Sequence, residues 1–399
     1  MKSIRKWFKK NSSIIKFTLL AFITWQVAIG IIIFLGAKYF STSNQYLYTE
    51  KQIINPSWLW SRANFDGIHY LDIARKGYGI YQQAFFPLYP KLIAFLTPFF
   101  GSRNLLAGWF LSLITFYFAI LLFYKLIKLD FKDSVVKRTI LYLLIFPTAF
   151  FFSMVYTESL FFLFIIGSFY FARTKHWWLA GILGGLASAT RLPGVFLFPA
   201  LLVEWWQQRE IKKSLRPELR ARAKLENKNW GISLLPIFLI PLGLLFYMRF
   251  LAINFGDSLM FIHVQKFFGA GRSADRIILL YQVFWRYFKM LVTVEKSTLT
   301  YFVVVMEFLA AASFLILIIF TYLKRWYSYL IFMVLAYITP TLTGTFLSLP
   351  RFVLVLFPGF ILLSLWSEKY RWIKILYPLI AIPLFVFCLI LFTRGFWVA

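Results

Sequence analysis

Cysteine is almost absent from this chain. Cys388 is the only cysteine among 399 residues, so neither an internal disulfide nor a cluster of thiolate metal ligands can form. Several catalytic motifs are absent as well: the Walker A loop, the dinucleotide glycine fingerprint, His-Glu-x-x-His and the nucleophile elbow. These absences argue against nucleotide-dependent, zinc-dependent and serine-nucleophile enzymes.

Acidic residues are also scarce, with 15 Asp and Glu against 43 Lys and Arg, which gives a net charge of +28. The basic residues gather before the first apolar run, from Lys2 to Lys16, and in one stretch from Arg209 to Lys228. This placement follows the positive-inside rule, and such clusters also attract anionic lipid headgroups. We therefore predict a membrane lipid partner and no nucleic acid.

Apolar residues dominate what is present: 61% of the chain is hydrophobic and 22% aromatic. Apolar runs of about 20 residues recur along the chain and indicate transmembrane helices, since backbone groups in lipid must satisfy one another. The alternating pattern of a membrane β-barrel is absent. We predict an all-α polytopic membrane protein with about 11 transmembrane helices, in a range of about 10 to 13.

Charge distribution places the N-terminus inside, with Ile14–Leu35 as a retained signal anchor. Proline at positions 87, 90 and 98 predicts that 85–100 lies in or re-enters the interface. We expect one domain, 1–399, with outer loops 41–103 and 253–298 and a basic inner loop 207–230. The expected spans are 14–38, 104–124, 139–152, 154–172, 177–189, 192–206, 231–252, 299–322, 327–347, 352–366 and 373–393. Gly181, Gly184 and Gly185 indicate close helix packing rather than phosphate binding.

This topology brings polar residues from five separate helix tips to the outer face. A carboxylate there, with cations nearby, suits transfer from a lipid-linked phosphate donor. We predict Asp66 as general base, with His69 either assisting it or only bonding within the loop. Arg191, Arg351 and Lys266 are predicted to hold the donor phosphate, because cationic donors pair with phosphate oxygens. The predicted substrate-binding residues are Tyr70, Tyr156, Glu158, Asp257, His263 and Gln265.

Two features of this region have alternative interpretations. The aromatic residues Trp58, Trp60, Tyr70, Tyr78 and Tyr81 could stack on a sugar ring or form an interfacial aromatic belt. Asp66, His69 and Asp72 could share a metal, but nothing else completes a ligand shell, so no metal site is predicted. A weakly held divalent cation stays open.

A set of short motifs in a fixed order resembles the PIG-V-type mannosyltransferases (GPI mannosyltransferase 2 and its bacterial relatives). The motifs span residues 58–360 and comprise Phe65-Asp66-Gly67-Ile68-His69-Tyr70, Gly77-Tyr78, Phe85-Phe86-Pro87-Leu88-Tyr89-Pro90, Phe146-Pro147, Tyr156-Thr157-Glu158-Ser159-Leu160-Phe161, Ala189-Thr190-Arg191-Leu192-Pro193-Gly194, Gly256-Asp257-Ser258-Leu259, His263-Val264-Gln265, Ser348-Leu349-Pro350-Arg351-Phe352 and Phe357-Pro358.

The resemblance implies a fold of the GT-C superfamily of membrane glycosyltransferases, with juxtamembrane helices in the first outer loop. It further implies inverting transfer from a polyprenyl- or dolichyl-phosphate sugar, without a nucleotide-sugar donor. No cofactor is predicted beyond this donor substrate. On this sequence Asp66 would be the base, and Arg191 and Arg351 the donor-phosphate contacts. The Lys-, Ile- and Phe-rich composition is typical of a prokaryotic chain, so we expect a plasma-membrane enzyme whose acceptor is a cell-envelope glycan, glycolipid or protein rather than a GPI precursor.

Two rival interpretations belong to other classes. A transporter or flippase for a lipid-linked sugar would need charges in mid-span, of which Glu307 is one. A non-catalytic scaffold in cell-envelope assembly would not need its polar residues gathered on one face. Binding of a lipid-phosphate sugar without turnover would favour either rival. The sugar, the acceptor, the polyprenyl length and the oligomeric state are not indicated by the sequence.

Overall fold

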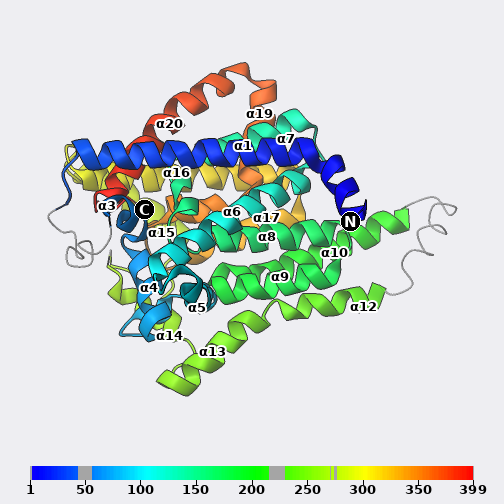
Figure 1. The fold of residues 1–399 in the computed structure, drawn as a ribbon, viewed down its shortest axis with the longest axis horizontal. Helices are drawn as coiled ribbons and strands as arrows, with labels where there is room; N and C mark the ends of the chain where they lie inside the picture. Colours follow the sequence, from blue (N-terminus) through cyan, green and yellow to red (C-terminus); the bar gives the residue numbers. More distant parts are fainter. Residues whose placement is uncertain (1, 44–55, 215–229, 270, 274–275, 399) are drawn as a thin grey trace. The chain divides into compact units, whose positions relative to one another are not determined.

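The computed structural model describes residues 2–43, 56–214, 230–269, 271–273 and 276–398. Within these ranges the chain is helical, with short connections and no β-strand (Figure 1). Five helical segments are long and apolar enough to cross a membrane, or six if one pair bent by 81° counts as a span. The predicted all-α, membrane-embedded class is confirmed to that extent, and the larger number of spans stays a prediction.

The chain divides into two compact units, which are described separately. The first comprises residues 1–82, 89–163 and 348–399, and the second comprises 83–88 and 164–347. The five long apolar segments are Ser12–Tyr39, Asn104–Lys128, Gly231–Phe255, Leu299–Leu323 and Arg371–Thr393. The predicted single domain and its loops stay predictions, and residues 44–55 and 215–229 of those loops lie outside the described residues.

In the first unit, α1 (Lys2–Tyr39) packs against α6 (Asn104–Lys128) and α20 (Arg371–Thr393) (Figure 1). The other elements are α3 (Ser57–Trp60), η1 (Ser61–Ala63), α4 (Asp66–Lys76), α5 (Leu88–Leu96), η3 (Thr97–Phe100), α7 (Asp133–Leu144), η4 (Ala149–Ser153), the start of α8 (Glu158–Arg173), α18 (Leu349–Phe352), η8 (Val353–Val355) and α19 (Pro358–Lys369). Aromatic rings fill the core, where those of Phe116 and Phe152 stack at 4.4 Å. The described part of segment 41–103 contains α3, α4 and α5, and its place outside the membrane stays a prediction.

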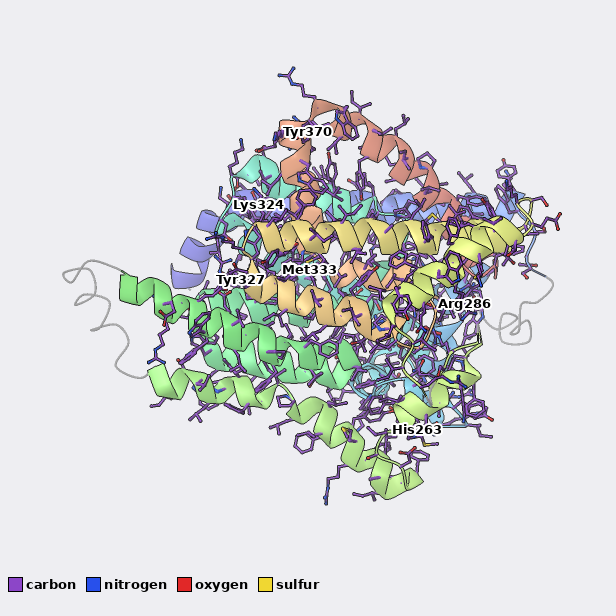
Figure 2. The ribbon with its side chains drawn as sticks, turned by 180° about the vertical axis from the view of Figure 1, so that it is seen from behind. His263, Arg286, Lys324, Tyr327, Met333 and Tyr370 are labelled. Carbon is purple, nitrogen blue, oxygen red and sulfur yellow. The ribbon has the colours of Figure 1, made fainter. Side chains whose placement is uncertain are left out.

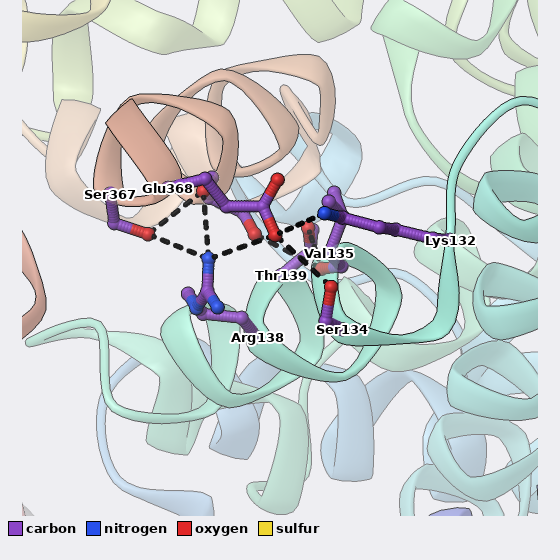
Figure 3. A network of polar contacts seen from close by, with 8 residues as sticks. Lys132, Ser134, Val135, Arg138, Thr139, Ser367 and Glu368 are labelled. Carbon is purple, nitrogen blue, oxygen red and sulfur yellow. Dashed lines mark hydrogen bonds and ion pairs between the residues drawn. The ribbon is translucent and has the colours of Figure 1, made fainter. Parts of the chain in front are cut away.

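A polar network fastens α7 to α19 in the first unit (Figure 3). Arg138 Nη1 donates to Ser367 Oγ at 3.2 Å and to the carbonyl of Ser364 at 3.3 Å. Ser134 Oγ donates to Glu368 Oε1 at 3.0 Å. The network thus joins the first half of α7 to the end of α19.

The second unit contains α9 (Trp177–Thr190), η5 (Leu192–Phe196), α10 (Leu197–Ser214), α12 (Trp230–Leu234), η6 (Leu235–Leu239), α13 (Leu242–Phe255), α14 (Met260–His263), η7 (Val264–Phe267), α15 (Leu280–Thr293), α16 (Leu299–Leu323) and α17 (Tyr327–Thr341). Helix α9 packs against η5, η6 and α13. A Cβ on Gly181 would lie 2.0 Å from the carbonyl oxygen of Pro236, and one on Gly184 would lie 2.6 Å from Ile240 Cγ1. The glycines therefore serve close helix packing, as predicted.

Polar side chains lie at both ends of the pair formed by α16 and α17. Figure 2 shows Lys324 and Tyr327 at the turn that joins these helices and Arg286 of α15 near the other end. Beside the turn, Ser328 Oγ donates to Glu204 Oε2 at 2.6 Å, and Arg173 Nε lies 3.4 Å from Glu204 Oε1.

Four predicted spans are not continuous helices. The expected helix 139–152 is wrong, because α7 ends at Leu144 and a 3-10 turn follows Pro147. The span 352–366 bends by 81° before Pro358, and 231–252 changes helix type at Pro236 and Pro241. The span 192–206 begins as the 3-10 helix η5 around Pro193. Proline lacks the N–H that an α-helix needs and clashes with the preceding turn, so each break falls where the sequence carries one.

Candidate functional site

The first unit brings two carboxylates to one guanidinium. Arg351 Nη1 donates to Asp66 Oδ2 at 2.7 Å, and Arg351 Nε lies 3.3 Å from Glu158 Oε1. Asp66, Glu158 and Arg351 were each predicted from the sequence, from three separate helix tips. Their direct ion pairing was not predicted, and it gives the cluster one more negative than positive charge.

Both carboxylates stand at the first residue of a helix. Asp66 begins α4 and Glu158 begins α8, and the N-terminal end of a helix carries a partial positive charge that stabilises anions. Gly67 lets α4 approach the backbone of Val155 closely, because a Cβ there would lie 3.2 Å from the carbonyl oxygen of Val155. Gly77, with φ of 80°, ends the helix and donates its N–H to the carbonyl of Ile73.

Backbone strain precedes both partners of the Asp66–Arg351 ion pair. Phe65, immediately before Asp66, has φ of 56°, and Ser348, three residues before Arg351, has φ of 65°. Such conformations are costly for residues other than glycine and persist only where packing holds them. The ring of Phe65 packs against Phe392 at 5.7 Å and Trp397 at 5.2 Å between centroids. These contacts fix the direction in which α4 leaves the strained residue.

Burial distinguishes the two carboxylates. The side chain of Asp66 is 18% exposed, whereas that of Glu158 is 1% exposed and that of Arg351 7%. The guanidinium carbon of Arg351 also lies 5.3 Å from the ring centroids of Phe151 and Tyr156. Asp66 is thus the carboxylate that an incoming molecule could reach, while Glu158 is the internal counter-charge.

Tyrosines line the inner side of this cluster. Tyr156 donates its hydroxyl to the carbonyl of Asn64 at 2.7 Å, and the hydroxyls of Tyr70 and Thr157 lie 3.5 Å apart. Both rings are buried, with 7% exposure for Tyr70 and 1% for Tyr156. In this conformation they support the ion pairs, and their predicted contact with substrate stays a prediction. Asn64, which the sequence did not single out, also donates to the carbonyl of Phe392 at 2.8 Å.

His69 lies one helical turn beyond Asp66 on α4 and is half-buried. Its Nδ1 lies 3.4 Å from Gln82 Nε2, a contact that orients the ring within the loop. Among the described residues no group of three or more His, Cys, Asp and Glu side chains could hold a metal ion. The expected absence of a metal site stays a prediction.

The remaining predicted residues, Arg191, Asp257, His263, Gln265 and Lys266, belong to the second unit. Asp257 Oδ2 pairs with His263 Nδ1 at 2.6 Å, on an exposed surface. Gln265 Oε1 accepts from Arg272 Nη1 at 3.1 Å, while Lys266 is exposed and its Nζ lies 5.5 Å from the ring centroid of Phe267. Arg191 ends α9, and its N–H bonds to the carbonyl of Ala187. Their binding roles stay predictions.

We expect the Asp257–His263 pair to stabilise the protein at neutral pH but not in acid. The hydrogen bond from His263 holds the pKa of Asp257 below its ordinary value of 3.8, and the N–H of Leu259 acts in the same direction. Since the folded-state pKa is lowered, the stabilisation is present above the ordinary value and is lost as pH falls through the lowered pKa. The melting temperature should therefore differ between wild type and Asp257→Asn at neutral pH, and this difference should vanish at strongly acidic pH.

The matched control is His263→Gln, which keeps a polar side chain but removes the charge partner. In that background the effect of Asp257→Asn should disappear at a higher pH, closer to the ordinary value of 3.8. A pH dependence that is identical with and without His263 would contradict the assigned cause.

A comparison of the chain with protein-family models finds no matching family, and a comparison with curated proteins finds no match. The resemblance in the sequence motifs therefore stays a hypothesis. Asp66, Glu158 and Arg351 are the residues whose chemistry bears on function.

Proposed function

We propose that this protein is an integral membrane glycosyltransferase that moves a sugar, mannose by resemblance, from a polyprenyl-phosphate donor to an acceptor hydroxyl outside the plasma membrane. The observation that supports it is an accessible carboxylate, Asp66, held by Arg351 beside a buried second carboxylate, Glu158. The long apolar helices of the chain are suited to a lipid-linked substrate. The N-terminus would lie in the cytoplasm.

The reaction is a single displacement at the anomeric carbon. The acceptor oxygen forms a bond to that carbon while its proton passes to Asp66, and the bond from carbon to phosphate oxygen breaks. The polyprenyl phosphate leaves with the bonding electrons, and the configuration inverts. A positioned carboxylate contributes about 10²–10⁴-fold to such a step as general base.

Arg351 was predicted to hold the donor phosphate, and in this structure it pairs with two carboxylates. Its contacts with Asp66 and Glu158 make it the counter-ion that holds the base in place. Since Glu158 is almost fully buried, it balances the guanidinium and leaves Asp66 less tightly neutralised than in an isolated pair. Contact of Arg351 with the donor phosphate, and the roles of Arg191 and Lys266, stay predictions.

A carrier for the same lipid is the alternative, and buried Glu307 in α16 is the residue that favours it. The hydroxyl of Tyr287 donates to Glu307, and this hydroxyl also lies 3.1 Å from Thr345 Oγ1 and accepts from the N–H of Phe346 at 3.1 Å. These contacts give Glu307 a packing role between α15 and α16. The enzyme assay decides between the two proposals.

The first test measures transfer from radiolabelled polyprenyl-phosphate mannose to a cell-envelope extract by purified protein in lipid. We expect wild-type turnover, and a loss of at least about 100-fold in Asp66→Asn because the amide cannot take the proton. Asn keeps the size of Asp and an oxygen for Arg351, so the variant should remain folded.

The matched control is Asp72→Asn, the same substitution further along α4, which should keep turnover. Unchanged turnover by Asp66→Asn would contradict the assignment of Asp66 as the general base. Saturable donor binding without transfer by wild type would favour the carrier, and a flipping assay would follow.

A further inference from the structure

Arg62, at the centre of η1, is a buried cation with no carboxylate paired to it in the described part of the chain. It is 4% exposed, and no ion pair joins it to any described residue. Its Nε has no hydrogen-bond partner among these residues. A charged group removed from water is costly unless it is paired. Burial lowers the pKa of Arg62 to about 10, so the guanidinium still carries its charge at neutral pH.

The neighbours of Arg62 offer further donors. Its guanidinium carbon lies 4.5 Å from the ring centroid of Trp109 on α6, and Nη1 reaches Ser153 Oγ only at 3.4 Å. Ser153 in turn donates to Gln26 Oε1 of α1 at 2.7 Å. Trp109 Nε1 and Gln26 Nε2 are buried and have no hydrogen-bond partner within the ranges that the structure describes. Thus all three unsatisfied atoms in this group are N–H donors.

The three unsatisfied N–H donors indicate which kind of ligand would bind here. An anion with several oxygens would satisfy them together, and a guanidinium binds phosphate oxygens in pairs. The stacking of Arg62 on Trp109 alone does not bond its Nε. Helices α1 and α6, which carry Gln26 and Trp109, are both long and apolar enough to cross a membrane. An anion that enters between them would come from a lipid.

We infer that Arg62, the indole N–H of Trp109 and the side-chain amide of Gln26 bind the phosphate group of a membrane lipid. Gln26 is the half-buried member, so its side chain can turn away from Ser153 to admit the phosphate. The lipid is either a polyprenyl phosphate or a phospholipid, which share this chemistry. The inference does not require that the protein transfers a sugar.

The test measures the melting temperature of delipidated full-length protein in detergent as lipid is titrated. The probes are polyprenyl monophosphate and phosphatidylglycerol, with polyprenol and diacylglycerol as matched lipids that lack phosphate. We expect saturable stabilisation of the wild type by a phosphate-bearing lipid and none by its phosphate-free match. Arg62→Met should weaken that binding at least tenfold, whereas Arg75→Met, at an exposed arginine of α4, should not.

The variants also separate a ligand site from a structural cation. Because Arg62 has no ion pair to lose, Arg62→Met without lipid should melt no lower than wild type. Trp109→Phe keeps the ring but removes the N–H, and should weaken lipid binding while leaving the lipid-free melting temperature unchanged. If Arg62→Met does not fold, the lipid response of Trp109→Phe decides alone.

Each outcome has a defined meaning. Loss of the polyprenyl phosphate response alone assigns the site to that lipid, and loss of the phosphatidylglycerol response assigns it to a phospholipid. An unchanged lipid response in both variants overturns the inference, as does a wild type that phosphate-bearing lipids do not stabilise. Because binding is read without turnover, a protein that binds lipid but transfers no sugar would refute only the proposed enzyme.

Discussion

Arg351→Met is expected to destabilise the first unit by about 3–5 kcal/mol, the usual cost of removing one partner from a buried ionic group. The substitution leaves Asp66 and Glu158 without the guanidinium that pairs with both. Glu158 is the more costly of the two, because its side chain is 1% exposed and cannot recover the lost interaction from water. Melting of purified protein in detergent measures the loss, and sugar transfer should fall with it.

A second substitution tests whether unpaired charge causes this effect. In Arg351→Met with Glu158→Gln, the buried negative charge is removed as well, so part of the stability should return. The recovery, obtained from a double-mutant cycle, reports the coupling between the two residues. If the double variant is as unstable as the sum of the single variants, packing of Arg351 against Phe151 and Tyr156 accounts for the loss instead.

Gly243→Ala should have a large effect on the second unit. A Cβ at this position of α13 would lie 2.1 Å from the carbonyl oxygen of Gly185 and 2.6 Å from the N–H nitrogen of Ala189. Both atoms belong to the backbone of α9, so a side-chain rotation cannot relieve the clash and the helices must separate. Overpacking of this kind costs about 1–3 kcal/mol or more, which a lower melting temperature and a lower folded yield would reveal.

The matched control is Gly30→Ala in α1, where an added Cβ meets nothing within 4 Å. Alanine is favoured over glycine in a helix by about 0.8–1 kcal/mol, so this variant should be as stable as wild type or more so. Equal effects of the two substitutions would show that the α9–α13 contact is not as close as the structure gives it.

Much of the helical architecture follows from local sequence. The long apolar runs predict α1, α6, α16 and α20 because membrane insertion depends on composition over a short window. Glycines spaced along α9 predict its close packing for the same local reason. The prediction of continuous helices was wrong at Pro147, Pro236 and Pro358. Hydropathy averaged over a window does not reveal a single proline that interrupts the helix.

The candidate site was predictable only as a set of residue types. Asp66, Glu158 and Arg351 stood out as charged residues at the ends of apolar segments, which identifies them one at a time. Their pairing joins residues separated by 285 positions, and no local pattern records such a contact. The lack of a carboxylate partner for Arg62 in the described chain could not be predicted from the sequence either, because it depends on which side chains the fold brings near it.

The sequence by itself therefore determined that this protein is helical and membrane-embedded, and which polar residues stand out from its apolar background. Tertiary structure decided that Arg351 pairs with Asp66 and Glu158, that only Asp66 among these carboxylates is accessible, and that Arg62 has no carboxylate partner in the described chain. The physical reason is that hydropathy is a property of neighbours along the chain, whereas the strength of a charge interaction depends on burial and distance in space.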